Sequence, residues 1–330
     1  MAEEEKKSGW RWGFNRWLVL AILIISFFTA RAFPPASPHI QLPAENVAGP
    51  LFDFLGQPFY LTNTIVAVLI ADLFLLIVGF AIWRGTRKGD GQALTGIPGA
   101  VEGLLEALYG LTEGTAGKWT KTIFPFFATI TLLVLVVNWM ELIPGVDSIG
   151  VFDEHHIHHP EECTFETINV LGLEMQALTD FENSECSAGV VPFVRVASTD
   201  LNFTVAIAIF AVVGIQWIGL RALGTEYLTK FFNVRTLFNK PMFGVIDFGV
   251  GLIELISEFI KIFSFAFRLF GNIFAGSVML FVIGSLVPVF AQSAFLLLEF
   301  FVGLVQAIVF GMLTMIFMSQ ATISHSGDEH

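Results

Sequence analysis

The chain alternates between long apolar segments and short polar ones. Each apolar segment reaches, or nearly reaches, the about 20 residues that a helix needs to cross a bilayer. The pattern therefore predicts an all-α, polytopic membrane protein with five or six membrane helices. The apolar segments are residues 17–33, 59–83, 123–143, 198–222, 243–287 and 290–322.

Composition agrees with this prediction. Of the 330 residues, 55% are hydrophobic and only 14% are charged, whereas soluble domains average about 25% charged residues. The formal net charge is −12. Because a nucleic-acid partner requires a basic surface, we expect no nucleic-acid partner, and the composition favours contact with a lipid bilayer.

The basic residues predict the orientation in the membrane. With the N-terminus in the cytoplasm, nearly all Lys and Arg of the polar segments are cytoplasmic, and only Arg31 and Arg195 fall outside. This distribution follows the positive-inside rule. Residues 146–197 then form an acidic external loop, and residues 323–330 form a polar cytoplasmic tail.

Residues 1–33 allow two interpretations. Their basic start, their apolar core from Leu18 to Phe28 and the small residues around Arg31 resemble a cleavable signal peptide. Without cleavage, the same residues would be a signal anchor. In both cases residues 34–58 are an external segment that leads into the next membrane helix.

The external loop also holds two features with open alternatives. The only cysteines, Cys163 and Cys186, can form a disulfide there, which we favour, or stay free thiols. The histidine cluster at 155–159 either binds a metal or, as we favour, is a polar loop tip. All seven histidines lie outside the predicted spans, which excludes a haem-bearing quinone oxidoreductase and an intramembrane zinc protease.

The spans group into larger segments. Residues 59–145 are expected to hold two membrane helices with a cytoplasmic amphipathic helix between them. Residues 198–242 add a membrane helix and a basic cytoplasmic loop. Residues 243–322 hold two segments too long for upright spans, because the 45 residues of the first would extend about 67 Å against a hydrocarbon core of about 30 Å. We therefore predict a long, strongly tilted helical hairpin.

One polar stripe runs along the first helix of this hairpin. Glu254, Glu258, Lys261, Arg268 and Asn272 fall within an arc of about 80°. The first three can pair with one another, but no carboxylate of this helix has the spacing to neutralise Arg268. Because ionisable groups at membrane depth are candidates for function, we expect the stripe to belong to an ion path.

Arg268 needs a partner from elsewhere, since a guanidinium does not lose its proton. Water or an acid from another protein is one possibility, and pairing for folding alone with Glu141, Asp72 or Glu299 is another. The final helix carries a second polar stripe, and chains of carboxyl and amide groups at membrane depth are typical of proton relays. This second stripe consists of Gln292, Glu299 and Gln306.

The chain resembles subunit a, the stator of the membrane sector of F-type ATP synthases. The similarity runs in order from about residue 59 to the C-terminal end, and its most specific part is the RLFGN core. The matching motifs are FRLFGNIFAG at 267–276, NWMELIP at 138–144, TDLN at 199–202 and Gln306-Ala307.

The resemblance implies a role for individual residues. Arg268 would be the essential cation that faces the carboxylates of a rotating ring of c subunits. Glu254 would serve a cytoplasmic exit path and Glu299 an uptake path from outside, while Ser277 occupies a position that is often acidic in the family. The implied ion path consists of Arg268, Asn272, Gln306, Glu299, Ser277, Glu254, Glu258 and Glu141.

The resemblance also implies a function and partners. The chain would conduct protons through two offset half-channels to and from the c ring, which couples ion flow to rotation and ATP synthesis. It would be no enzyme by itself and would need no cofactor. Its partners would be the c ring, the peripheral-stalk b subunits and the rest of the complex, in a bacterial plasma (inner) membrane. The N-terminus, if retained, and the C-terminus would be cytoplasmic. The alternative is a secondary ion-coupled transporter.

Overall fold

The computed structural model describes residues 16–22, 24–25, 28, 43–54, 56–87, 96–147, 149–152, 165–170, 173–178, 190–231, 241–286 and 290–323. Cys163, Cys186 and the histidine cluster at 155–159 lie outside these residues, so the disulfide and the nature of the cluster stay predictions. The tail from residue 324 onward lies outside them as well.

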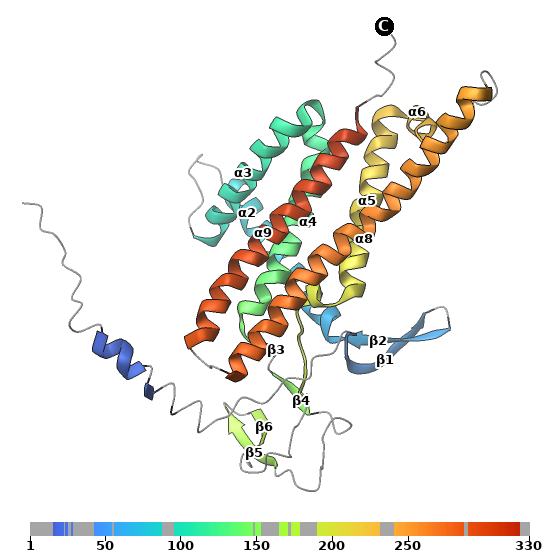
Figure 1. Ribbon diagram of the computed structural model, residues 1–330. Helices are drawn as coiled ribbons and strands as arrows, with labels where there is room; N and C mark the ends of the chain where they lie inside the picture. The colour runs from blue at the N-terminus through green and yellow to red at the C-terminus, as the bar shows by residue number, and fades with distance from the viewer. Residues whose placement is uncertain are drawn as a thin grey trace, which may run out of the picture. The chain divides into compact units, whose positions relative to one another are not determined.

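Helices make up most of the described chain (Figure 1), which confirms the predicted helical class. Among the described residues, five stretches are long and apolar enough to cross a membrane: residues 63–85, 99–142, 201–223, 248–284 and 291–321. The protein is therefore a multi-pass membrane protein. The helices are α2 (Asn63–Arg87), α3 (Ile97–Ala116), α4 (Thr120–Trp139), α5 (Leu201–Leu223), α6 (Glu226–Thr229), α8 (Pro241–Leu286) and α9 (Phe290–Ala321).

A turn separates α3 from α4 inside one long apolar stretch. Gly117 has a φ of 50°, a left-handed conformation that favours glycine, and it opens the short 3-10 helix η1 (Gly117–Trp119). In α3, Leu108 is buried while Glu106 and Glu113 are exposed, as in an amphipathic helix. The cytoplasmic position of this helix stays a prediction.

Short strands occupy segments that were expected to be loops, and one of them extends into the predicted helix 59–83. β1 (Asn46–Phe54) pairs antiparallel with β2 (Gln57–Thr62), β5 (Phe165–Val170) pairs antiparallel with β6 (Leu173–Leu178), and β4 (Gly150–Phe152) pairs with β7 (Val190–Pro192). The strand β3 (Pro144–Asp147) follows the 3-10 helix η2 (Met140–Leu142). Because β2 continues to Thr62, α2 begins at Asn63 rather than at residue 59.

The chain divides into two compact units. The larger contains residues 40–151, 191–277 and 299–330, and the smaller contains residues 1–39, 152–190 and 278–298. In the larger unit α4, α5, α8 and α9 run side by side (Figure 1) around a shared core. Its largest fully buried side chains include Phe127, Ile215, Leu269, Ile273 and Phe310. In the smaller unit, Gly284 of α8 lies beside the Gln292 side chain of α9.

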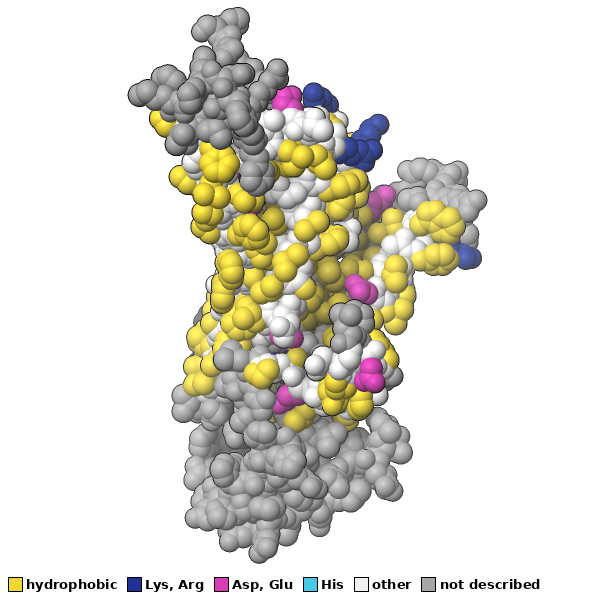
Figure 2. Space-filling view, turned by 90° about the vertical axis from the view of Figure 1, so that its right-hand side faces the viewer, with side chains coloured by type: hydrophobic (Ala, Val, Ile, Leu, Met, Phe, Trp, Pro, Cys, Tyr) yellow, Lys and Arg dark blue, Asp and Glu magenta, His cyan; other side chains and the backbone are white. Residues whose placement is uncertain are grey.

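The outward surface of the helices is apolar. Figure 2 shows a face on which hydrophobic side chains cover the middle, while the Lys and Arg side chains lie in the upper half of the view. On α2, the side chains of Leu69, Leu73 and Leu76 are all more than half exposed. An apolar surface of this extent is unfavourable in water and suits lipid.

Candidate functional site

Arg268 lies near the middle of α8 and has no ion pair with any described carboxylate. Its Nη2 atom donates a hydrogen bond of 3.3 Å to Oγ of Ser264, one turn earlier on the same helix. Asp72, one of the carboxylates considered as a folding partner, is exposed on α2. A pairing of Arg268 with Asp72, Glu141 or Glu299 is therefore not found in this part of the chain.

Asn272 and Gln306 connect the two long helices beside this arginine. Asn272 is one turn beyond Arg268, and its Nδ2 atom donates to Oε1 of Gln306 at 2.8 Å. Gln306 is buried. The structure thus joins a residue of the first predicted stripe to one of the second, close to the unpaired guanidinium.

A carboxyl cluster, which consists of Glu141, Ser277 and Glu299, lies farther along α8. The hydroxyl of Ser277 donates to Oε1 of Glu141, which brings the NWMELIP motif against α8. Glu299 is buried on α9, and a Cβ atom on Gly276 would overlap its carboxyl group. Glu141 and Glu299 lie close enough to repel each other when both are charged.

Three buried polar atoms of the described residues have no hydrogen-bond partner, and all three belong to the predicted ion path. They are Oε2 of Glu141, Oε1 of Glu299 and Nε2 of Gln306. Buried polar groups are nearly always satisfied, so each exception calls for a functional or structural reason. Each of these atoms can therefore form a further hydrogen bond.

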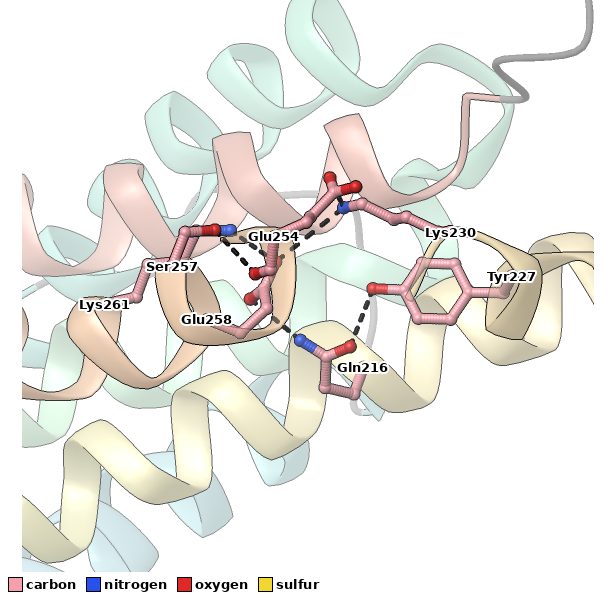
Figure 3. A network of polar contacts seen from close by, with 7 residues as sticks. All are labelled: Gln216, Tyr227, Lys230, Glu254, Ser257, Glu258 and Lys261. Carbon is pink, nitrogen blue, oxygen red and sulfur yellow. Dashed lines mark hydrogen bonds and ion pairs between the residues drawn. The ribbon is translucent and has the colours of Figure 1, made fainter. Parts of the chain in front are cut away.

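A charge cluster joins α6 to α8 at the other end of the arginine's helix (Figure 3). We define this α6–α8 charge cluster as Lys230, Glu254, Glu258 and Lys261. Lys230 Nζ lies 2.8 Å from Oε1 of Glu254 and 3.8 Å from Oε1 of Glu258. Lys261 Nζ lies 2.7 Å from Oε1 of Glu258. The predicted pairing of Glu258 with Lys261 is confirmed, but the partner of Glu254 is Lys230 and not a residue of its own helix.

Two further side chains extend this cluster toward α5. Gln216 Nε2 donates to Oε2 of Glu258 at 2.9 Å, and the hydroxyl of Tyr227 donates to Oε1 of Gln216 at 2.8 Å. Burial, together with the nearby carboxylates of Glu258 and Glu254, raises the pKa of Tyr227 above its usual range. The phenol therefore stays protonated and keeps its donor role in Figure 3.

A polar network connects the start of α2, the end of α4 and the start of α5. Ser198 Oγ donates to Oδ1 of Asn138 at 2.6 Å, and Asn138 Nδ2 donates to the carbonyl of Gly303 at 3.2 Å. Thr64 Oγ1 donates to Asp200 at 3.0 Å. This network holds the start of α5 and the NWMELIP motif against α9, and so positions the carboxyl cluster.

Asp147 is the last residue of β3 and lies next to this network. Its Oδ1 atom accepts a hydrogen bond from the backbone N–H of Val196 at 3.3 Å, and its φ of 60° is one that Asp and Asn tolerate better than most residues. Burial raises the pKa of Asp147 to about 6, although the Val196 N–H and the charge of Arg195 act in the opposite direction.

Several residues of the site were not singled out from the sequence. Gln216 had a usable signal, because a polar side chain within the apolar segment 198–222 is a candidate for function. Lys230, Tyr227 and Asp147 had none, since each depends on a contact with a distant part of the chain. Among the described residues, no group of three or more His, Cys, Asp or Glu could hold a metal ion.

The comparison with protein families gives one match. The model of the family described as ATP synthase A chain matches residues 64–319. This range is more than half of the chain and runs from the second residue of α2 to near the end of α9. It includes Arg268, the carboxyl cluster and the α6–α8 charge cluster.

Proposed function

The chain belongs to the ATP synthase A chain family, and on this premise we propose that its helices form two offset half-channels for protons. As a member of the family, the chain is the proton-conducting stator subunit of an F-type ATP synthase. It is a membrane subunit of that complex and not an enzyme by itself. The proposal concerns the residues that form the path and the partners that they meet.

Arg268 is proposed as the cation that faces the acids of a rotating c ring. The single observation that carries this proposal is its guanidinium without a carboxylate partner in the described chain. A fixed positive charge stabilises the ionised form of an acid that approaches it, so a ring acid would release its proton there. The same charge opposes the direct passage of protons from one half-channel to the other. Such a leak would dissipate about 2.3 kcal/mol per proton for each 100 mV of membrane potential.

The carboxyl cluster is proposed as the uptake path. Glu299 and Glu141 each have one buried oxygen without a partner, and Ser277 donates to Glu141. Neighbouring carboxyl groups of this kind pass protons readily, because repulsion disfavours two negative charges at once. Asn272 and Gln306 would lie between this cluster and the ring-facing arginine.

The α6–α8 charge cluster is proposed as the exit path to the cytoplasm. Glu254 is the more exposed of its two carboxylates, with a third of its side-chain surface open, against 7% for Glu258. Glu254 can therefore exchange protons with water, while the buried Glu258 holds the α5, α6 and α8 side chains together. The remaining partners would be the peripheral-stalk b subunits, in a bacterial inner membrane with the N-terminus, if retained, and the C-terminus cytoplasmic.

The test is the Arg268→Lys substitution in the complete synthase, reconstituted in liposomes. We expect a loss of gradient-driven ATP synthesis of more than about tenfold, because a compact ammonium does not replace a planar guanidinium. Lys261→Arg is the matched control, since it keeps a cation next to Glu258 on the same helix. Near-normal synthesis by Arg268→Lys, or proton-coupled transport by this chain without the c ring, would contradict the proposal.

A further inference from the structure

The β1–β2 hairpin is attached directly to the beginning of a membrane span. β2 ends at Thr62 and α2 begins at Asn63, the first residue of the span 63–85. The hairpin therefore starts where the chain leaves the membrane, and its strand β2 can reach about 20 Å from that point. In Figure 1 it extends sideways from the start of α2 rather than along the helices.

The base of the hairpin is held firmly. The N–H of Asn63 donates to the carbonyl of Glu45 at 3.0 Å, and its Oδ1 accepts from the N–H of Glu45 at 3.2 Å. Its Nδ2 also donates to the carbonyl of Pro192 at 3.3 Å. Asn63 is fully buried. These bonds fix the start of β1 and the end of β2 to the helix, so the hairpin keeps its position at this end of α2.

The hairpin carries an aromatic pair on one face and a charged side chain on the other. Phe52 and Phe59 are cross-strand partners, and their rings stack with centroids 4.9 Å apart. Their exposed fractions are 54% and 36%, so the stack has an uncovered surface. Asp53 and Pro58 form the next pair and point to the opposite face, because successive side chains alternate along a strand. Asp53 is the only charged residue between positions 46 and 62.

The hairpin comes immediately before a helix whose exposed surface is apolar. On α2, Leu69, Ile70 and Leu73 are exposed, as expected for a helix surrounded by lipid. We propose that the Phe52–Phe59 face rests on the lipid interface of the membrane and anchors the outer end of α2, with Asp53 directed to water. The phenyl rings are apolar, so their exposed surface is more favourable against lipid than in water.

Site-directed spin labelling of the complete complex in liposomes tests this proposal. In a Cys163→Ser, Cys186→Ser background, single labels are placed at Phe52→Cys, Phe59→Cys and Asp53→Cys. Collisions of each label with oxygen, which concentrates in lipid, are compared with collisions with a water-soluble nickel chelate. ATP-driven proton pumping by each labelled complex checks that it has assembled.

The ratio of oxygen to nickel collisions should be several-fold higher at positions 52 and 59 than at position 53. Phe52→Cys and Phe59→Cys are measured separately. If one of these variants fails to assemble, the other is sufficient to test the proposal. Equal ratios at all three positions would place the hairpin in water and overturn the proposal. Low collision rates with both reagents at positions 52 and 59 would also overturn it, because they would mean that another protein covers this face.

Discussion

Asn272 of α8 donates a hydrogen bond of 2.8 Å to Gln306 of α9. This bond crosses the interface between the two long helices, one turn from Arg268. It is a direct link between the two polar stripes of the sequence. Its loss should loosen the helix pair at the level where the arginine must face its moving partner.

A double-mutant cycle of Asn272→Leu and Gln306→Leu measures the strength of this link. We expect a coupling free energy of about 0.6 kcal/mol, and no more than about 1.7 kcal/mol, as for other interhelical hydrogen bonds in membranes. Unfolding of the subunit in a titration with sodium dodecyl sulfate provides the measurement. A coupling free energy of zero would mean that the two side chains separate in the working protein.

Gly276→Ala tests the close approach of α8 to the Glu299 carboxyl group. The added methyl would overlap that carboxyl and displace it from its place near Glu141. A displacement of about 1 Å can cost up to about a hundredfold in rate, so we expect gradient-driven ATP synthesis to fall by at least about tenfold. Gly79→Ala on α2 is the matched control, because no atom lies within 4 Å of its added Cβ. Equal rates in the two variants would contradict the proposed position of the uptake path.

Glu299→Gln tests the uptake role of this side chain more directly. The amide keeps the shape of the carboxyl group but does not take up or release a proton. Loss of a positioned acid or base typically lowers the rate at least about a hundredfold. ATP synthesis driven by an imposed proton gradient should slow accordingly, while ATP hydrolysis by the detached catalytic sector should not change. Synthesis at the wild-type rate would place the uptake relay on other residues.

Asp147→Asn tests the pH dependence of the contact between β3 and the segment before α5. Burial raises the pKa of Asp147 from 3.8 to about 6, so the folded state binds this proton more tightly than the unfolded state does. The resulting stabilisation is complete below about pH 4 and is lost as the pH rises through about 6. It amounts to at most about 3 kcal/mol.

Hydrogen exchange of residues 194–200 in the assembled complex measures this effect. Wild-type protection, corrected for intrinsic exchange, should decrease between pH 4 and pH 7, whereas the Asp147→Asn variant should change little. Asn keeps the acceptor for the Val196 N–H and tolerates a positive φ. The same decrease in both proteins would assign the pH dependence to another group.

The sequence was informative where function depends on periodicity within one helix. Arg268 and Asn272 are four residues apart, so their common face could be predicted, and the lack of a carboxylate at helical spacing predicted a guanidinium without a local partner. Long apolar runs likewise predicted α8 and α9. Their tilt in a bilayer stays a prediction, because it depends on surroundings that the chain does not encode alone.

Contacts between distant segments were not predictable in this way. Tyr227 reaches Gln216 because Gly219 leaves room for its ring, and Lys230 reaches Glu254 because the chain reverses after α5. No local pattern indicates either contact. The stretch from Phe59 to Thr62 was assigned to a helix because apolar runs alone do not separate a strand from a helix, whereas Pro58 and the aromatic residues after it suit an edge strand.

The α6–α8 charge cluster pairs two ammonium groups with two carboxylates, Lys230 with Glu254 and Lys261 with Glu258. Paired opposite charges act as dipoles, whose potential falls off faster with distance than that of a single charge. Arg268 has no such counter-charge in the described chain. Among the described side chains of α8, the charge of Arg268 is therefore the one that acts as a monopole, and a charged group that moves past it is guided by the position of this residue.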